Sequence, residues 1–177
     1  MYKVRRHQIG ILLLSFLLSG SFAYSQTPSL TLSAGSGAQG SSVPLNLSLN
    51  APTGQAPTAL QWTLSYTPGN IVSVNLANGA ALTGAGKTLN CTAQVGSVAC
   101  LASGMNANSI GNGVVAVVTV TLSASSSPTV PIAIGNSIGA LPNGSALSVS
   151  GNGSTITVQT SQTVVSQVQC NPTSCIR

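Results

Sequence analysis

The sequence predicts an all-β fold, a β-sandwich of two stacked, mostly antiparallel sheets. Three observations support this prediction. Apolar and polar residues alternate over many short stretches, and clusters of Gly, Pro, Asn and Ser separate these stretches. No long stretch shows the apolar period of an amphipathic helix. Many short strands joined by turns, without helices, are typical of a sandwich.

The first 25 residues are expected to be a secretory signal peptide. Lys3, Arg5 and Arg6 precede the apolar run at 9–18, and the small residues Ala23 and Ser25 follow it. The run is shorter than the roughly 20 apolar residues of a membrane-spanning helix. We therefore expect cleavage before Gln26, a secreted or cell-surface protein, and no membrane span after cleavage.

The charged residues exclude several classes of function. The chain has no Asp or Glu, and without residues 1–25 its only basic side chains are Lys87 and Arg177. Paired carboxylates for glycoside hydrolysis and carboxylate ligands for hard cations are therefore missing. General acid–base groups are scarce, since the only His is His7. The sequence predicts no enzyme, no metal or other cofactor, and no nucleic-acid partner, because no basic stripe remains to track phosphates.

The expected strands follow one another along a single domain at 26–159. They lie at 30–34, 43–50, 60–67, 71–77, 88–95, 98–103, 114–122, 130–134, 147–150 and 155–159. Turn-forming residues separate them at 51–58, 67–70, 84–86, 106–113 and 123–129. Residues 160–177 are rich in Ser, Thr and Gln and lack this rhythm, so we expect a linker or a disordered tail.

The segment LQWTLSYTPGNIVSVNL (60–76) contains the only aromatic residues that follow the expected signal peptide, Trp62 and Tyr66. Successive side chains of a strand point to opposite faces, so both rings share a face with Leu60 and Leu64. A sugar-binding platform needs exposed rings, whereas rings interleaved with leucines face a core. We therefore predict that Trp62 and Tyr66 are core residues.

Three segments resemble a cohesin domain: GSSVPLNLSLN (40–50), LQWTLSYTPGNIVSVNL (60–76) and GVVAVVTVTLSASSSPTVPIAI (113–134). The similarity covers residues 29–159. It implies a cohesin-like jelly-roll sandwich of about nine strands. It also implies a non-catalytic protein that holds dockerin-bearing partners on a secreted or cell-surface scaffold, often for polysaccharide breakdown. Two other functions stay open: a carbohydrate-binding module that uses Asn, Gln and Ser, and a structural cell-surface or adhesin unit.

The resemblance also implies a binding face on one outer sheet surface, formed by the segments at 60–67, 88–95, 98–103 and 114–122. Apolar side chains that alternation places outside suggest partner contact, and acidic residues, common on this face in the family, are absent here. The candidate residues are Gln61, Thr63, Ser65, Asn90, Thr92, Gln94, Leu101, Val115 and Val117.

Four cysteines in a secreted chain predict disulfides. Cys91 and Cys100 flank a tight turn near 94–97, which would set them opposite each other on adjacent strands, with both side chains pointing inward. Cys170 and Cys175 could close a small loop around Pro172. We predict the pairs Cys91–Cys100 and Cys170–Cys175, and the other two connectivities stay open.

Overall fold

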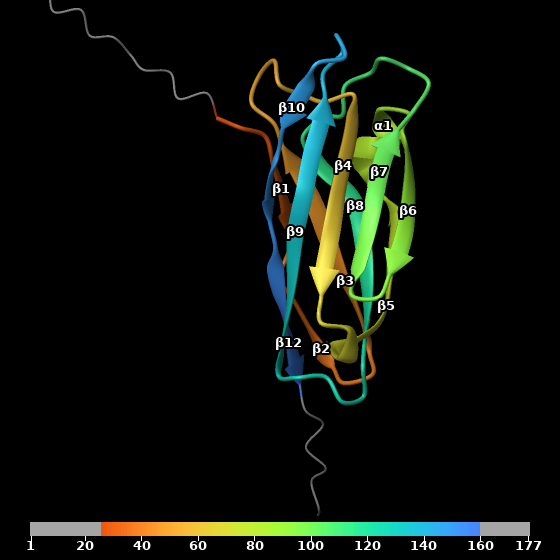
Figure 1. The fold of residues 1–177 in the computed structure, drawn as a ribbon, viewed down its shortest axis with the longest axis vertical. Coiled ribbons are helices and arrows are strands. Elements are labelled where there is room, and N and C mark those ends of the chain that lie inside the picture. Colours follow the sequence, from red (N-terminus) through yellow and green to blue (C-terminus); the bar gives the residue numbers. More distant parts are fainter. Residues whose placement is uncertain (1–25, 160–177) are drawn as a thin grey trace, which may run out of the picture.

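The computed structural model describes residues 26–159, which form two sheets packed face to face (Figure 1). Their strands are β1 Ser29–Leu32, β2 Gly35–Ala38, β3 Ser42–Asn50, β4 Ala59–Tyr66, β5 Ile71–Asn78, β6 Thr88–Gln94, β7 Ser97–Ser103, β8 Gly113–Leu122, β9 Thr129–Ala140, β10 Ala146–Ser148, β11 Ser150–Asn152 and β12 Ser154–Gln159. A 3₁₀ turn, η1 Pro68–Asn70, and a helix, α1 Ala80–Gly84, complete the elements.

One sheet has the strand order β11-β1-β3-β8-β5, and the other has the order β2-β12-β9-β4-β7-β6, with β10 paired to β9. All pairings between these strands are antiparallel except β1 with β11 and β12 with β2. The predicted sandwich of mostly antiparallel sheets is therefore confirmed.

Alternation along the strands builds the core between the sheets. In β3 the side chains of Val43, Leu45, Leu47 and Leu49 are buried, while the residues between them face outward or are half-buried. In β4, Leu60, Trp62 and Leu64 are buried in the same way, and Trp62 is 0% exposed. The predicted core position of Trp62 is confirmed. Tyr66 is half-buried and packs at the rim of the core.

The strand predicted at 30–34 is in fact two strands in different sheets. Leu32 of β1 pairs with Leu47 of β3, whereas Gly35 of β2 pairs with Ile156 of β12. A Cβ atom at Gly35 would lie 2.5 Å from the Leu45 side chain, so the absence of a side chain lets β2 lie close to the core. The sequence pattern did not reveal this crossover, and it is one reason why the strands outnumber the nine or so that we expected.

The structure also contains a short helix that was not expected. The helix α1 follows β5, and Leu82 is its buried residue. Among residues 26–159, no helix is long and apolar enough to cross a bilayer.

Candidate functional site

The solvent-facing side of β9, β4, β7 and β6, called here the outer face, forms the front layer in Figure 1. Strand register places its side chains in rows that run across the four strands, because residues directly opposite each other share a face. The rows are Ile138–Gln61–Leu101–Asn90, Gly135–Thr63–Ala99–Thr92 and Ala133–Ser65–Ser97–Gln94.

A β-bulge in β9 brings Ile138 to this face. Gln61 pairs with Ile138 and Thr63 pairs with Gly135, so two residues of β9 lie opposite Trp62 alone. Asn136, one of these two residues, has a φ of 49°, which is the left-handed region that Asn tolerates better than most residues. The bulge reverses the alternation of β9: Ile132 is buried before it, whereas Ile138 after it is 44% exposed.

Ile138 and Leu101 flank Gln61 on the two neighbouring strands, and each is 44% exposed. Beside them is a shallow hollow of about 270 Å³, lined by Gln61, Leu101, Ile138, Ala140, Gly144 and Ala146. A second shallow depression runs from Gln61 across Leu101 to Asn90 and Thr92. The middle of the outer face therefore combines two apolar side chains with amides that donate and accept hydrogen bonds.

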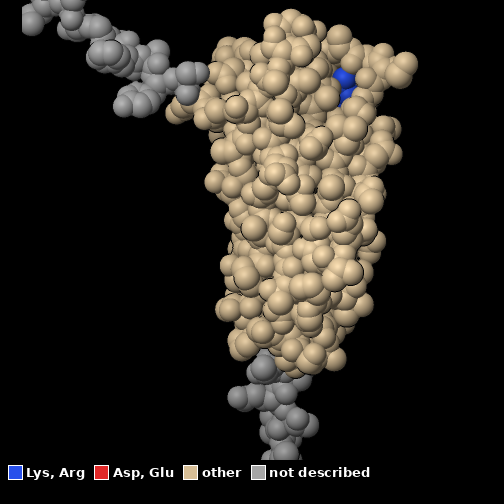
Figure 2. Space-filling view, in the orientation of Figure 1, with Lys and Arg blue, Asp and Glu red and all other residues tan. Residues whose placement is uncertain are grey.

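The outer face carries no charge. In Figure 2, which has the orientation of Figure 1, the surface over these strands shows no acidic colour, and basic colour appears only at the top edge. The only charged side chain within residues 26–159 is Lys87. It is 2% exposed, and its Nζ donates a hydrogen bond to the backbone carbonyl of Asn106 at 2.7 Å. Any partner of this face must therefore be recognised without ion pairs.

The structure brings most of the candidate residues together. Gln61, Thr63, Ser65, Asn90, Thr92, Gln94 and Leu101 all lie on the outer face. The assignment of Val115 and Val117 to the same face is wrong, because both residues belong to β8, which is in the opposite sheet.

The expectation that Val115 projects outward is also wrong. Val115 is 0% exposed and lies at a bulge between β3 and β8, where Leu47 pairs with Ala116 and Ser48 pairs with Val114. The bulge breaks simple alternation, so Val115 and Ala116 are both buried. Val117 is half-buried on the far sheet.

The fourth strand of the outer face is β9, which sequence reasoning missed as a source of site residues. It contributes Ala133, Gly135 and Ile138. The strand prediction ended at 134, whereas β9 continues to Ala140. The dipeptide Gly135-Asn136 is a signal that could have revealed the bulge, because both residue types tolerate positive φ better than other residues do.

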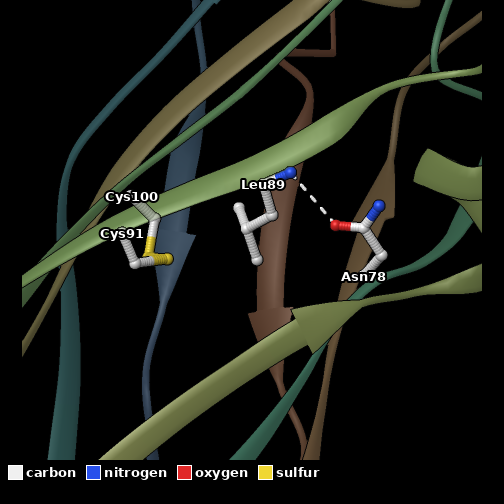
Figure 3. Close-up of a disulfide and its surroundings, with 4 residues drawn as sticks. All are labelled: Asn78, Leu89, Cys91 and Cys100. Atoms are coloured by element: carbon white, nitrogen blue, oxygen red, sulfur yellow. Dashed lines mark hydrogen bonds between the residues drawn. A yellow bond between two sulfur atoms is a disulfide. The ribbon is translucent and has the colours of Figure 1, made fainter.

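The predicted disulfide between Cys91 and Cys100 is confirmed (Figure 3). The two residues lie directly opposite each other on β6 and β7. Cys100 is buried as expected, but Cys91, which lies on the edge strand β6, is exposed. The predicted pair Cys170–Cys175 lies outside the described residues. Within residues 26–159, no three His, Cys, Asp or Glu side chains form a group that could hold a metal ion.

No protein-family model and no curated protein matches the sequence. Solved structures do match the fold. The sixth cohesin of scaffoldin B from Acetivibrio cellulolyticus, solved in complex with a dockerin, is 15% identical over 76% of this chain and 100% of its own, with a TM-score of 0.66. The cohesin of a cohesin–dockerin complex from Clostridium thermocellum is 12% identical over 76% of this chain and 100% of its own, also with a TM-score of 0.66.

A non-cellulosomal cohesin from the archaeon Archaeoglobus fulgidus is 12% identical over 76% of this chain and 92% of its own, with a TM-score of 0.63. These similarities extend over almost the whole length of each cohesin, and they agree with the jelly-roll sandwich that the resemblance in the sequence implied. Residues 26–159 therefore have the fold of a cohesin domain.

Proposed function

We propose that this chain is a non-catalytic docking module whose outer face binds a protein partner of the dockerin type. The observation that carries the proposal is one row of the outer face, in which Ile138 and Leu101 place exposed apolar side chains on both sides of the Gln61 amide. The similar solved structures include cohesins in complex with dockerins, which supports a partner of this kind.

Binding would rest on apolar contact at Ile138 and Leu101 and on neutral hydrogen bonds from the surrounding amides and hydroxyls. Charge-assisted hydrogen bonds are stronger than neutral ones, and this face supplies no charged group for them. Affinity should therefore change little with ionic strength, since salt screens interactions between charges.

Two contacts constrain the outer face. The disulfide holds β6 to β7, and the Asn136 side-chain amide donates a hydrogen bond to the Thr63 hydroxyl across the bulge at 3.4 Å. A preorganised surface loses less conformational entropy when it binds. These two contacts support docking without a large rearrangement of the module.

Secretion forms part of the proposal. The basic and apolar pattern at 1–25 and the disulfide Cys91–Cys100 both support an extracellular or cell-surface location, because disulfides persist in oxidising compartments. A link to polysaccharide breakdown would follow if the partner that docks carries a polysaccharide-degrading enzyme.

Carbohydrate binding has less support from the site. Trp62 is buried between the sheets and Tyr66 is half-buried, so the outer face presents no aromatic platform among the described residues. Binding of glycans through amides and hydroxyls alone would lack the stacking contacts that such a platform provides.

The proposal can be tested by titrating ¹⁵N-labelled protein, from Gln26 onward, with a panel of purified calcium-loaded dockerins. We expect at least one dockerin to shift the amide signals of Gln61, Leu101 and Ile138, while signals on the outer side of β3, such as that of Asn46, stay unchanged. Shifts confined to the β3 side, or no shift with any dockerin while a glycan array gives binding, would overturn the proposal.

A further inference from the structure

The strand β6 is an edge that lacks the usual protection against pairing with another chain. It ends the strand order of its sheet, and it pairs with β7 without a bulge from Thr88 to Gln94. Natural proteins protect such edges with lysines, prolines, bulges or a covering loop. The sequence of β6, TLNCTAQ, contains neither a charge nor a proline.

The spacing between β6 and β7 shows which backbone groups point away from the sheet. The Cα atoms of Cys91 and Cys100 are 4.1 Å apart, which is the close spacing of a non-hydrogen-bonded antiparallel pair. The N–H and C=O of Cys91 therefore point away from β7. The same holds for Leu89 and Ala93, which are two residues away on either side.

One of these positions is already occupied by Asn78, the last residue of β5. Its Oδ1 accepts a hydrogen bond from the Leu89 N–H at 3.0 Å (Figure 3), and its Nδ2 donates one to the Lys87 carbonyl at 3.0 Å. The Asn78 carboxamide therefore takes the place of a peptide group from a neighbouring strand. The outward backbone groups of Cys91 and Ala93 have no such partner among residues 26–159.

Exposed apolar surface lies beside this open part of the edge. A groove of about 580 Å³ separates the start of β5 from the turn between β6 and β7. Val72 and Val95, which line it, are 71% and 91% exposed, and the half-buried Tyr66 also lines it. A chain that paired with β6 at Cys91 and Ala93 would cover part of this surface.

We propose that a second copy of this domain pairs with β6 through an antiparallel two-fold interface, with Cys91 of one copy opposite Ala93 of the other. Two copies of one strand are self-complementary in this arrangement, because each outward N–H meets an outward C=O. No charge repels them, since Lys87, the only charged side chain of the domain, is buried. Thr92 of each copy would lie on the two-fold axis, where a Thr–Thr pair is favourable.

Asn78 sets the register and the extent of this interface. Pairing centred on Thr92 uses Cys91 and Ala93 and leaves the Leu89–Asn78 hydrogen bond intact. A longer pairing would have to displace the Asn78 side chain. The interface is short, so association should be weak and reversible. It would join two sheets side by side and leave both outer faces accessible except at Thr92, which would contact Thr92 of the other copy.

Sedimentation equilibrium tests the proposal directly. The chain from Gln26 to Arg177, with Cys170 and Cys175 replaced by Ser to prevent intermolecular disulfides, should change from monomer to dimer at concentrations on the order of 10 µM to 1 mM. Ala93→Pro removes one outward N–H and leaves the pairing with β7 intact, and it should raise the dimer dissociation constant at least about tenfold. If Ala93→Pro does not fold, Ala93→Lys places a charge at the same edge and should have the same effect.

Asn46→Lys is the matched control, because it adds the same charge on the exposed outer side of β3 and should dimerise like the parent. Amide hydrogen exchange adds a residue-level readout. The amides of Cys91 and Ala93 should exchange more slowly as concentration rises, whereas the Leu89 amide should be protected at every concentration. A parent protein that stays monomeric up to the highest concentration, or an Ala93→Pro variant that dimerises equally well, would overturn the proposal.

Discussion

Lys87 donates a hydrogen bond from Nζ to the backbone carbonyl of Asn106 at 2.7 Å, and it does so while 2% exposed in a chain without a single carboxylate side chain. The contact joins the start of β6 to the loop after β7. Hydrogen bonds from Asn106 to the Gly86 carbonyl and from Asn108 to the Ala85 carbonyl strengthen the same junction. Lys87 therefore fastens a loop rather than binding an anion.

Two substitutions of Lys87 distinguish the contribution of its charge to stability from the contribution of its packing. Lys87→Met should change the free energy of unfolding by less than about 1 kcal/mol, because removing a buried charge offsets the loss of a hydrogen bond to a charged group worth about 1.5–3 kcal/mol. Lys87→Ala should lower it by about 2–3 kcal/mol, since it also leaves a cavity. Urea denaturation measures both variants, and equal losses for the two would contradict this account.

The fluorescence of Trp62 should show that its indole is inaccessible to solvent. Its indole is fully buried, and its Nε1 has no hydrogen-bond partner among residues 26–159. Acrylamide should therefore quench its fluorescence poorly in the native protein. Trp62→Phe should lower the free energy of unfolding by only about 1–2 kcal/mol, since it removes an unsatisfied N–H, whereas Trp62→Ala should lower it by about 3–5 kcal/mol. Efficient quenching in the folded protein would place the indole at the surface.

The disulfide Cys91–Cys100 closes a short loop, with a sequence separation of 9. The double variant Cys91→Ala/Cys100→Ala should lower the free energy of unfolding by about 2–3 kcal/mol, because the unfolded chain regains entropy. In differential scanning calorimetry, the double variant and the reduced parent protein should both melt at a lower temperature than the oxidised parent protein. A melting temperature unaffected by either change would mean that the pairing of β6 with β7 needs no cross-link.

Stability should hardly depend on pH in the acidic range. The domain has no Asp, Glu or His side chain that could bind protons between pH 7 and pH 3. Stability depends on pH only through groups that bind protons differently in the folded and unfolded states, and the domain has no such side chain in this range. We expect the melting temperature of the chain from Gln26 onward to vary by less than about 2 °C over this range. A steep fall toward pH 3 would be incompatible with this reasoning.

Local alternation was sufficient to predict most strands and the core. The pattern in LQWTLSY places Leu60, Trp62 and Leu64 inward, and the structure agrees because β4 is regular along this segment. The same reasoning placed Gln61, Thr63 and Ser65 on the outer face. The spacing of Cys91 and Cys100 around a tight turn was likewise enough to predict their register.

Errors arose where the fold depends on contacts between distant segments. The resemblance implied that 114–122 belongs to the binding face, and alternation could not correct this, because it does not show to which sheet a strand belongs; β9 lies there in place of β8. Bulges at Val115 and Asn136 each reverse the alternation, which buries Val115 and exposes Ile138. The position of a bulge is fixed only once the partner strand is known, and the dipeptide Gly135-Asn136 is the one local sign of the bulge in β9.

Calorimetric titration with a dockerin that binds the parent protein tests the docking account most directly. Leu101→Arg places a charged, bulky side chain in the middle of the outer face, while Asn46→Arg makes the same addition on the exposed side of the opposite sheet. We predict that Leu101→Arg weakens binding by at least about 1.4 kcal/mol, a factor of ten, and that Asn46→Arg leaves it unchanged. Equal affinities for Leu101→Arg and the parent, or a loss of binding only in Asn46→Arg, would contradict the docking account.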